Sequence, residues 1–321
     1  MKRVLLSLLV VVVSTFGLTV SADAAGGPTC GDTITHSVKL RHDIVNCAAT
    51  PALKIAGSDL TLNMNGHSLS GKDTNTGIDV DGQDHVTVKD GRLRHFNTAV
   101  SFESDNADHA IRLIVDTVTT GIAMSATSNA LASRNRISRA TYGIIDGVTT
   151  TSDVIASNVI TSASFGIFLQ DAPTRLTVER NRINGGTTGI TDSATGSPAS
   201  VRITRNRVIR SGVGIDDTSG SNTFHQIDAN TVLRSTGAGI ILEGALGVDV
   251  VFGNRVIKNG GDGIQDSIVT VGVDIGDNVA DKNGSYGIEG QPVVNDAGGN
   301  RAKGNGRVTH PFVQCLDLIC R

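Results

Sequence analysis

Short apolar stretches alternate with polar bends along most of the chain, and the alternation repeats. Residues 201–230 contain a strand with Val201 and Ile203, an asparagine at a bend, a short strand around Val208, and a Gly-Ile step that opens a third strand. The asparagine recurs every 22 to 25 residues, at Asn135, Asn158, Asn181, Asn206, Asn230, Asn254, Asn278 and Asn300. The Gly-Ile step keeps the same period, at Gly121, Gly143, Gly166, Gly189, Gly214, Gly239, Gly263 and Gly287. Two independent markers with one period indicate a repeat protein.

This period, with several short strands per unit and no helical pattern, predicts a parallel solenoid in which each repeat is one coil. Coils stack at the strand spacing, roughly 4.8 Å, so equivalent residues form ladders along the axis. We expect the asparagine amides to hydrogen-bond to one another and to the backbone at each bend. About eleven coils are expected, with strands near Leu60, Val86, Ile111, Leu131, Val154, Leu176, Val201, Ile227, Val250, Val273 and Val293.

The unit V-x-I-x-x-N-x-V…G-I resembles the right-handed parallel β-helix repeat of the pectin-lyase-like superfamily, over residues 53–305. That superfamily includes pectate lyases, polygalacturonases, uronan epimerases and periplasmic copper-maturation β-helix proteins. Both ends of the chain resemble a largely uncharacterised subgroup of secreted bacterial β-helix proteins. The resemblance implies an all-β, single-stranded right-handed parallel β-helix, but it leaves the activity open because one fold carries many functions.

The N-terminus is typical of a secretory signal peptide, with Lys2 and Arg3, an apolar run over residues 4–13, and Ala-Asp-Ala at 22–24. A membrane anchor is the alternative. No later segment is apolar enough to span a bilayer. We therefore expect a secreted or extracytoplasmic protein, in the extracellular space, cell envelope or periplasm, without stable membrane insertion after signal cleavage.

Four cysteines lie near the two ends, and exported chains meet an oxidising compartment. Of the three possible pairings, the local one requires the least chain travel: Cys30 with Cys47, and Cys315 with Cys320. A metal site or redox pair is the alternative, which the absence of a Cys-x-x-Cys motif and of interleaved histidines disfavours. Disulfide-closed caps would cover the apolar edges of the end coils. The expected organisation is a signal peptide at 1–24, an N-terminal cap at 25–52, one β-helix at 53–305 and a C-terminal cap at 306–321.

Composition narrows the partners. With 28 basic and 31 acidic residues, the net charge is -3, so general nucleic-acid binding is disfavoured. Neutral or crystalline glycans are usually held by aromatic faces, but the chain has no Trp and only two Tyr. Cellulose-like and chitin-like ligands are therefore disfavoured. We expect the protein to be a monomer.

Four cations follow successive repeat asparagines at the same offset and at intervals of 24 residues: Arg210, Arg234, Lys258 and Lys282. They should stack as a column roughly 5 Å apart, where like charges repel. One interpretation is that acids across the turn neutralise the column, namely Asp217, Glu243, Asp266 and Glu289. The other is that a regularly charged anionic polymer binds to it. A partial second column directly follows the asparagines, at Arg136, Arg182, Arg207, Arg255 and Arg301.

Two acidic groups are candidates for chemistry. If Asp81 and Glu103 are register mates, with Asp79 beside them, they suit a calcium ion or an acid and nucleophile pair; a solvated acidic face is the alternative. Asp216 and Asp217 follow a Gly-Ile step and resemble the paired aspartates of polygalacturonase-like hydrolases. The companion Gly-His-Gly and Arg-Ile-Lys elements, and the Asp-Pro-His-Asp signature of uronan epimerases, are missing. A turn or capping role is therefore the alternative for this pair.

We therefore expect a β-helix protein that binds an acidic polysaccharide and, if it is an enzyme, acts as a polysaccharide lyase, glycoside hydrolase or uronan epimerase. No cofactor is required by the sequence, although calcium would suit the first acidic group. Two alternatives stay open: a non-enzymatic envelope scaffold or protein-binding solenoid, and a copper-maturation-like protein. Copper would need neighbouring His, Met or Cys ligands, for which His85 and His109, 24 residues apart, are the candidates.

Overall fold

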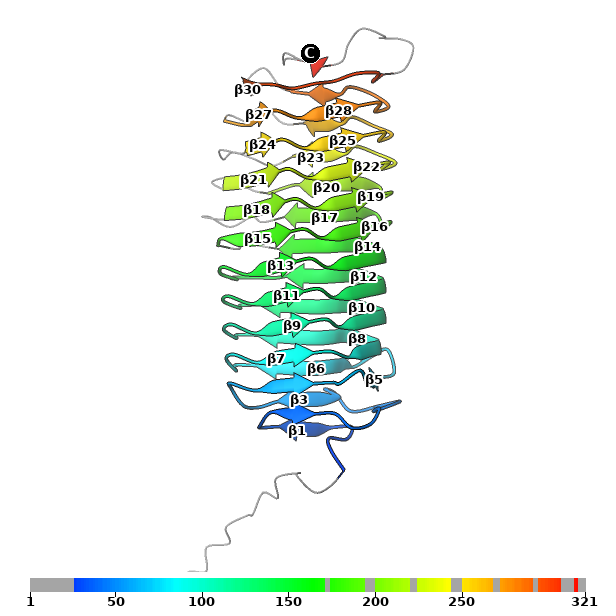
Figure 1. Ribbon diagram of the computed structural model, residues 1–321, viewed down its shortest axis with the longest axis vertical. Coiled ribbons are helices and arrows are strands. Elements are labelled where there is room, and N and C mark those ends of the chain that lie inside the picture. Colours follow the sequence, from blue (N-terminus) through cyan, green and yellow to red (C-terminus); the bar gives the residue numbers. More distant parts are fainter. Residues whose placement is uncertain are drawn as a thin grey trace, which may run out of the picture.

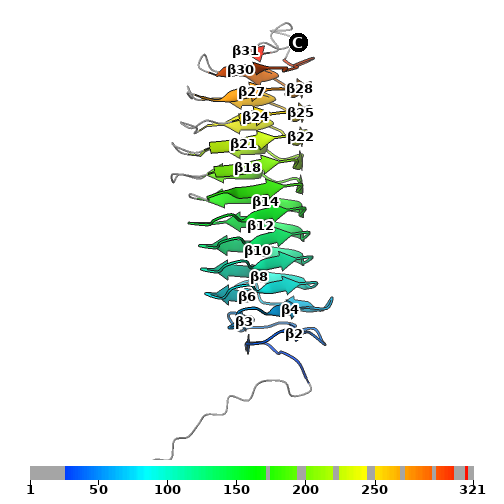
Figure 2. The same ribbon diagram turned by 60° about the vertical axis from the view of Figure 1, so that its left-hand side comes forward.

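The chain winds into a single stack of parallel β-strands, with the N-terminal coils at one end and the C-terminal coils at the other (Figure 1). The computed structural model describes residues 26–170, 174–193, 200–219, 224–243, 250–267, 272–290, 294–306 and 315–316. Figure 2, turned by 60°, shows the same regular stacking from another side. The all-β parallel β-helix that the sequence predicted is confirmed.

One sheet takes one strand from each coil and has twelve strands; we call it the first face. From β4 onward, its strands are the eleven that the sequence predicted, and β2 precedes them. The strands are β2 (Val38–Lys39), β4 (Thr61–Asn63), β7 (Thr87–Lys89), β9 (His109–Ile111), β11 (Leu131–Ser133), β13 (Val154–Ala156), β15 (Leu176–Glu179), β18 (Ser200–Thr204), β21 (Phe224–Asp228), β24 (Val250–Phe252), β27 (Asp274–Gly276) and β30 (Asn295–Gly298).

A nineteen-stranded sheet supplies the other two faces. Four long strands run through both of them, namely β8 (Arg92–Glu103), β10 (Ile114–Ser125), β12 (Arg136–Asp146) and β14 (Val159–Gln170). In later coils the path divides. The second face, after the asparagine bend, then holds β16 (Arg182–Asn184), β19 (Arg207–Ile209), β22 (Thr231–Leu233), β25 (Arg255–Ile257) and β28 (Val279–Asp281). The third face, at the Gly-Ile step, holds β17 (Thr188–Ser193), β20 (Val213–Asp217), β23 (Ile240–Leu242), β26 (Ile264–Asp266) and β29 (Ile288–Glu289). The remaining strands of this sheet belong to the end coils and are β1 (Asp32–Ile34), β3 (Leu53–Ile55), β5 (Ser68–Ser70), β6 (Thr76–Asp81) and β31 (Cys315–Leu316).

Apolar ladders fill the interior, as the alternation predicted. The residues two positions after each asparagine are register mates on the second face, as in Ile160, Ile183 and Val208, and all three are fully buried. The isoleucine of each Gly-Ile step forms a second ladder on the third face. Glycine precedes it because the coils approach closely there: a Cβ on Gly143 would lie 2.4 Å from the Gly166 carbonyl oxygen.

The repeat asparagines form a continuous buried amide ladder, which confirms their structural role. At Asn206, the backbone N–H donates to Asn230 Oδ1 (2.8 Å), and Nδ2 donates to Asn230 Oδ1 (3.1 Å) and to the Val178 carbonyl (2.8 Å). The same pattern links Asn135 through to Asn300. The ladder satisfies backbone groups that would otherwise be unpaired inside each bend.

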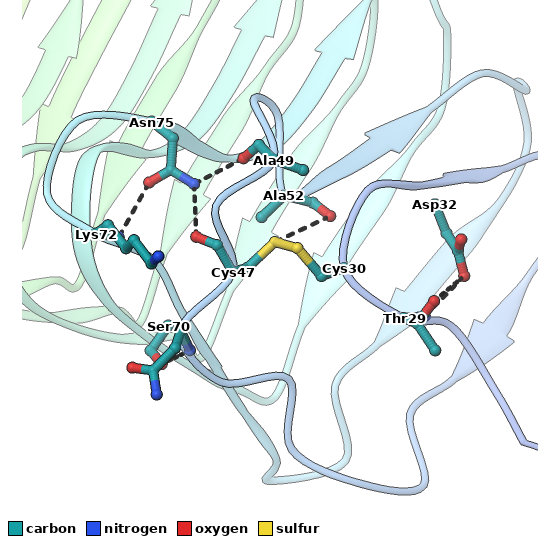
Figure 3. The surroundings of a disulfide bond; sticks show 10 residues. Thr29, Cys30, Asp32, Cys47, Ala49, Ala52, Ser70, Lys72 and Asn75 are labelled. Atoms are coloured by element: carbon teal, nitrogen blue, oxygen red, sulfur yellow. Dashed lines mark hydrogen bonds between the residues drawn. A yellow bond between two sulfur atoms is a disulfide. The ribbon is translucent and has the colours of Figure 1, made fainter.

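The N-terminal segment joins the stack through β1 and β2, which pair in parallel with β3 and β4. The expected Cys30–Cys47 disulfide is present, and Figure 3 shows how the Asn75 amide anchors it by donating to the carbonyls of Cys47 (3.2 Å) and Ala49 (2.7 Å). The expected signal peptide at 1–24 and Cys320 of the expected second disulfide lie outside the described residues. Within the part that the structure covers, no helix has the length and hydrophobicity needed to cross a membrane.

Candidate functional site

The predicted cation column lies at the corner where the second face turns into the third. The residues directly before the four cations are register mates, Ile209 with Leu233, Leu233 with Ile257, and Ile257 with Asp281. All four cations adopt a left-handed backbone, with φ of 59° or 60°, and all four side chains are exposed. The chain therefore turns at each cation in the same way and stacks the side chains along the axis.

A second amide ladder holds this corner in place. The residues that directly follow the cations bond from coil to coil: Ser235 N–H donates to Asn259 Oδ1 (2.8 Å), and Asn259 N–H donates to Asn283 Oδ1 (3.0 Å). Asn283 N–H continues the ladder to Asn305 Oδ1 (2.8 Å). Sequence analysis missed this ladder, although the intervals between these asparagines carry the same repeat period. It makes the corner a rigid base for the charged column.

The second face carries a second cation column parallel to the first. Arg182 and Arg207 are register mates, and Arg255 follows beyond Thr231; the three arginines are exposed. Between the columns runs an apolar strip of register-matched residues, Ile209, Leu233 and Ile257.

The two columns and the strip together line a groove of about 560 Å³, which we call the basic groove. Its lining residues are Arg182, Asn184, Arg207, Ile209, Arg210, Leu233, Arg234, Arg255, Ile257, Lys258, Asp281 and Lys282. The lining thus combines seven cations with one acid, Asp281, and that acid is paired with Arg301.

The acids expected to neutralise the corner column do not do so. Of the four expected acids, Asp217 and Asp266 point into the interior and are fully buried, and Glu243 and Glu289 form no ion pair with a groove cation in the part of the chain that the structure describes. Among the described residues, none of the seven groove cations has a carboxylate within 4.0 Å. Elsewhere on the solenoid, exposed arginines do pair with acids, as in Arg112 with Asp90 and Arg202 with Asp228. The basic groove is therefore a concentrated, uncompensated positive surface on a chain whose net charge is -3.

The candidate pair Asp216 and Asp217 is divided between the two sides of the sheet. Both residues lie in β20, where successive side chains alternate between solvent and core. Asp216 points outward and is half-buried; burial, and then the nearby charges of Glu243 and Asp217, raise its pKa to about 6. Asp217 points inward, so the two carboxyls do not face one common substrate.

Asp217 belongs to an interior cluster whose histidine, His225, sequence analysis missed. His225 Nδ1 lies 3.0 Å from Asp217 Oδ2 and 3.4 Å from Asp192 Oδ2, and Ser219 Oγ lies 3.2 Å from the same nitrogen. All four residues are buried. Burial alone would raise the pKa of Asp217, but the charge and hydrogen bond of His225 lower it below its ordinary value. His225 is the register mate of Val201, so its polar character at an apolar ladder position was the available signal.

Asp81 and Glu103 are register mates, as the first acidic candidate required, and Asp79 is paired with Ser101. Asp81 and Glu103 are exposed. Asp79 is half-buried, and burial and the Asp81 charge raise its pKa. A metal site needs at least three ligand atoms close together. Among the described residues, ligand atoms of Asp, Glu, His or Cys converge within 4.8 Å in one group, which does not include Asp79, Asp81 or Glu103.

Comparison with known proteins agrees with this architecture. A family model described as periplasmic copper-binding protein (NosD) matches residues 56–229. No curated protein matches the sequence.

Solved structures match at low sequence identity. A point mutant of the periplasmic alginate epimerase AlgG is 15% identical, with a TM-score of 0.58 over 84% of this chain and 77% of that one. The catalytic unit of the thermostable GH87 α-1,3-glucanase from Streptomyces thermodiastaticus strain HF3-3 is 14% identical, with a TM-score of 0.52 over 88% of this chain and 65% of that one. At these identities, the similarity shows the fold.

The described residues do not fit a copper site. The group with converging ligand atoms consists of Asp192, Asp217 and His225. It offers one imidazole and two carboxylates, whereas copper sites favour several imidazole or sulfur donors. The Nδ1 atom already contacts both carboxylates. His85 and His109 do not supply a pair either, because the register places His109 beside Thr87.

Proposed function

The chain belongs to the family described as periplasmic copper-binding protein (NosD), and within this β-helix family we propose that it binds an acidic polysaccharide in the basic groove. One observation carries the proposal: seven exposed cations line one groove, and none is paired with an acid of the described residues. Like charges held close together repel, so a surface of this kind is stabilised when an anion binds to it.

The shape of the basic groove favours a sugar polymer over a small anion. Its floor is the strip of Ile209, Leu233 and Ile257, which can pack against the C–H faces of sugar rings while acidic groups reach the cations on either side. The cations repeat with the coils, so they suit a ligand whose charges also repeat. The solved structures with this fold include an alginate epimerase and an α-1,3-glucanase, which supports a carbohydrate ligand.

The location fits such a ligand. The family is described as periplasmic, and the Cys30–Cys47 disulfide belongs to an oxidising compartment. Together they support an extracytoplasmic protein, where acidic polysaccharides of the envelope and surroundings are accessible.

The test is binding of the protein to immobilised uronans and to neutral glucans at low and high ionic strength. The wild-type protein should retain uronans at low salt, release them at high salt because exposed charges are screened, and ignore neutral glucans. The variant Arg234→Glu with Lys258→Glu should lose retention.

The matched control is Arg134→Glu with Arg175→Glu. These two arginines are also exposed and have left-handed φ values of 57° and 63°, but they lie outside the basic groove. The control should retain uronans. Equal retention by both double variants, or no retention by wild-type protein, would overturn the proposal and favour a scaffold that binds proteins.

Processing of the bound polymer is a second candidate function, favoured by Asp216. Its outward carboxyl has a pKa raised to about 6 and lies on the third face of the solenoid. A carboxyl of this kind can act as a general acid near neutral pH. Uronan incubated with wild-type protein should then give products that Asp216→Asn does not, and absence of products would leave binding alone.

A further inference from the structure

We propose that the polymer lies parallel to the solenoid axis with one sugar on each coil, so that the basic groove provides five consecutive subsites. This inference rests on the proposed function and specifies the ligand's direction, length and charge repeat. The five coils are those of β16, β19, β22, β25 and β28, each of which contributes to the lining. They extend over about 20 Å, since neighbouring coils are about 4.8 Å apart.

The direction follows from the register. Both cation columns and the apolar strip between them run from coil to coil, along the axis. A chain lying across the axis would cross each column once and meet few charges. A chain lying along the axis keeps its ring faces on Ile209, Leu233 and Ile257 and passes between both columns throughout, so that every cation of the lining flanks it.

The length follows from where the charge begins and ends. In the preceding coil, β14, the equivalent positions are Val159, the register mate of Arg182, and Ser162 at the corner. At the other end, Gly304 occupies the next corner position, and Arg301 is paired with Asp281. The uninterrupted run of free positive charge is therefore confined to five coils, because the next cation of the second column, Arg136, lies beyond the uncharged Val159.

The charge repeat follows from the spacing of the second column. Arg207 and Arg255 lie two coils apart, with the uncharged Thr231 between them. The numbers of cations on successive coils therefore alternate as one, two, one, two, one. In an extended polymer with two-fold symmetry, acidic groups on the same edge recur at every second sugar. Such a polymer places acids of one edge on Arg207 and Arg255, and acids of the other edge opposite Arg234 and Lys282 in the coils between.

The experiment is calorimetric binding of size-defined oligouronates, from one to eight sugars, to the full protein. Affinity should rise by about two- to fivefold for each added sugar, as for one exposed ion pair, until the chain has five sugars. For chains longer than five sugars, the affinity should rise only by a statistical factor, because a longer chain can place more than one set of five sugars in the groove. Neutral oligosaccharides of the same lengths serve as the control and should not bind.

Variants at the ends and in the middle of the groove sharpen the test. Lys282→Ser removes the last subsite, so the plateau should move from five sugars to four. Arg234→Ser lies in the centre and should weaken all oligomers of three or more sugars without moving the plateau. A plateau at two sugars, or a plateau unmoved by Lys282→Ser, would overturn the axial arrangement while leaving uronan binding intact. Failure of every oligomer and of the polymer to bind would instead overturn the proposed function itself.

Discussion

Replacing Arg234 with asparagine should stabilise the ligand-free protein and weaken its binding to an acidic polymer. Arg234 lies between Arg210 and Lys258 in the corner column, and no described carboxylate pairs with it. Asparagine removes the charge and tolerates the left-handed backbone at this position, where φ is 59°. The substitution therefore relieves repulsion at little conformational cost.

The expected gain can be worked out from the column spacing. Two unit charges about 4.8 Å apart repel by about 0.9 kcal/mol in bulk water. At physiological ionic strength, screening reduces this by roughly half, so removing a charge with two neighbours should raise the free energy of unfolding by about 1 kcal/mol. At about 1 M salt the Debye length falls to about 3 Å, and the gain should shrink to about 0.3 kcal/mol.

Urea unfolding of wild-type and variant protein at low, physiological and high salt measures this gain. Arg134→Asn is the control, because Arg134 is exposed with a similar φ of 57°, while its neighbours in the ladder are Ser157 and Arg112, and Arg112 is already paired with Asp90. Any benefit of asparagine at a left-handed position is common to both variants. The argument that the column is uncompensated would be refuted by either of two results. One is that Arg234→Asn raises the free energy of unfolding no more than Arg134→Asn does, and the other is that its increase does not depend on salt.

Two further predictions concern the scaffold. Asn206→Ala should lower the free energy of unfolding by about 2–4 kcal/mol, because it leaves the buried N–H of Asn181 without its acceptor and removes the bond from Asn206 Nδ2 to the Val178 carbonyl. A loss below about 0.5 kcal/mol in urea unfolding would contradict the role of the ladder. Burial, and then the charge of Asp105, raises the pKa of Asp108 to about 8. The folded state therefore holds a proton that the unfolded state releases near pH 4. As a result, the free energy of unfolding should fall as pH rises from about 4 to about 8. Asp108→Asn should flatten that decline in pH-dependent thermal unfolding, and an unchanged slope would count against a protonated Asp108.

Much of the architecture could be predicted from spacing alone. The period shared by the asparagines and the Gly-Ile steps implied the coil, and the coil implied the ladders, because parallel strands stack equivalent residues. The corner column was predictable for the same reason, since its cations share one offset and one period. The second amide ladder, through Asn259 and Asn283, carries the same kind of signal and was missed because it covers only the last coils.

Sequence alone therefore determined the repeat, the ladder positions and the column of charge, because these depend only on the number of residues in each turn. The tertiary structure decided how the charges are compensated. Asp217 was expected among the acids that could neutralise the column, but the alternation of β20 turns it inward to His225, whereas Asp216 faces outward. The joining of two cation columns with an apolar strip into one groove also required the fold, since those residues come from five coils. Spacing fixes which residues lie above one another, but only the path of the backbone fixes which side of the sheet, and which opposite charge, each of them meets.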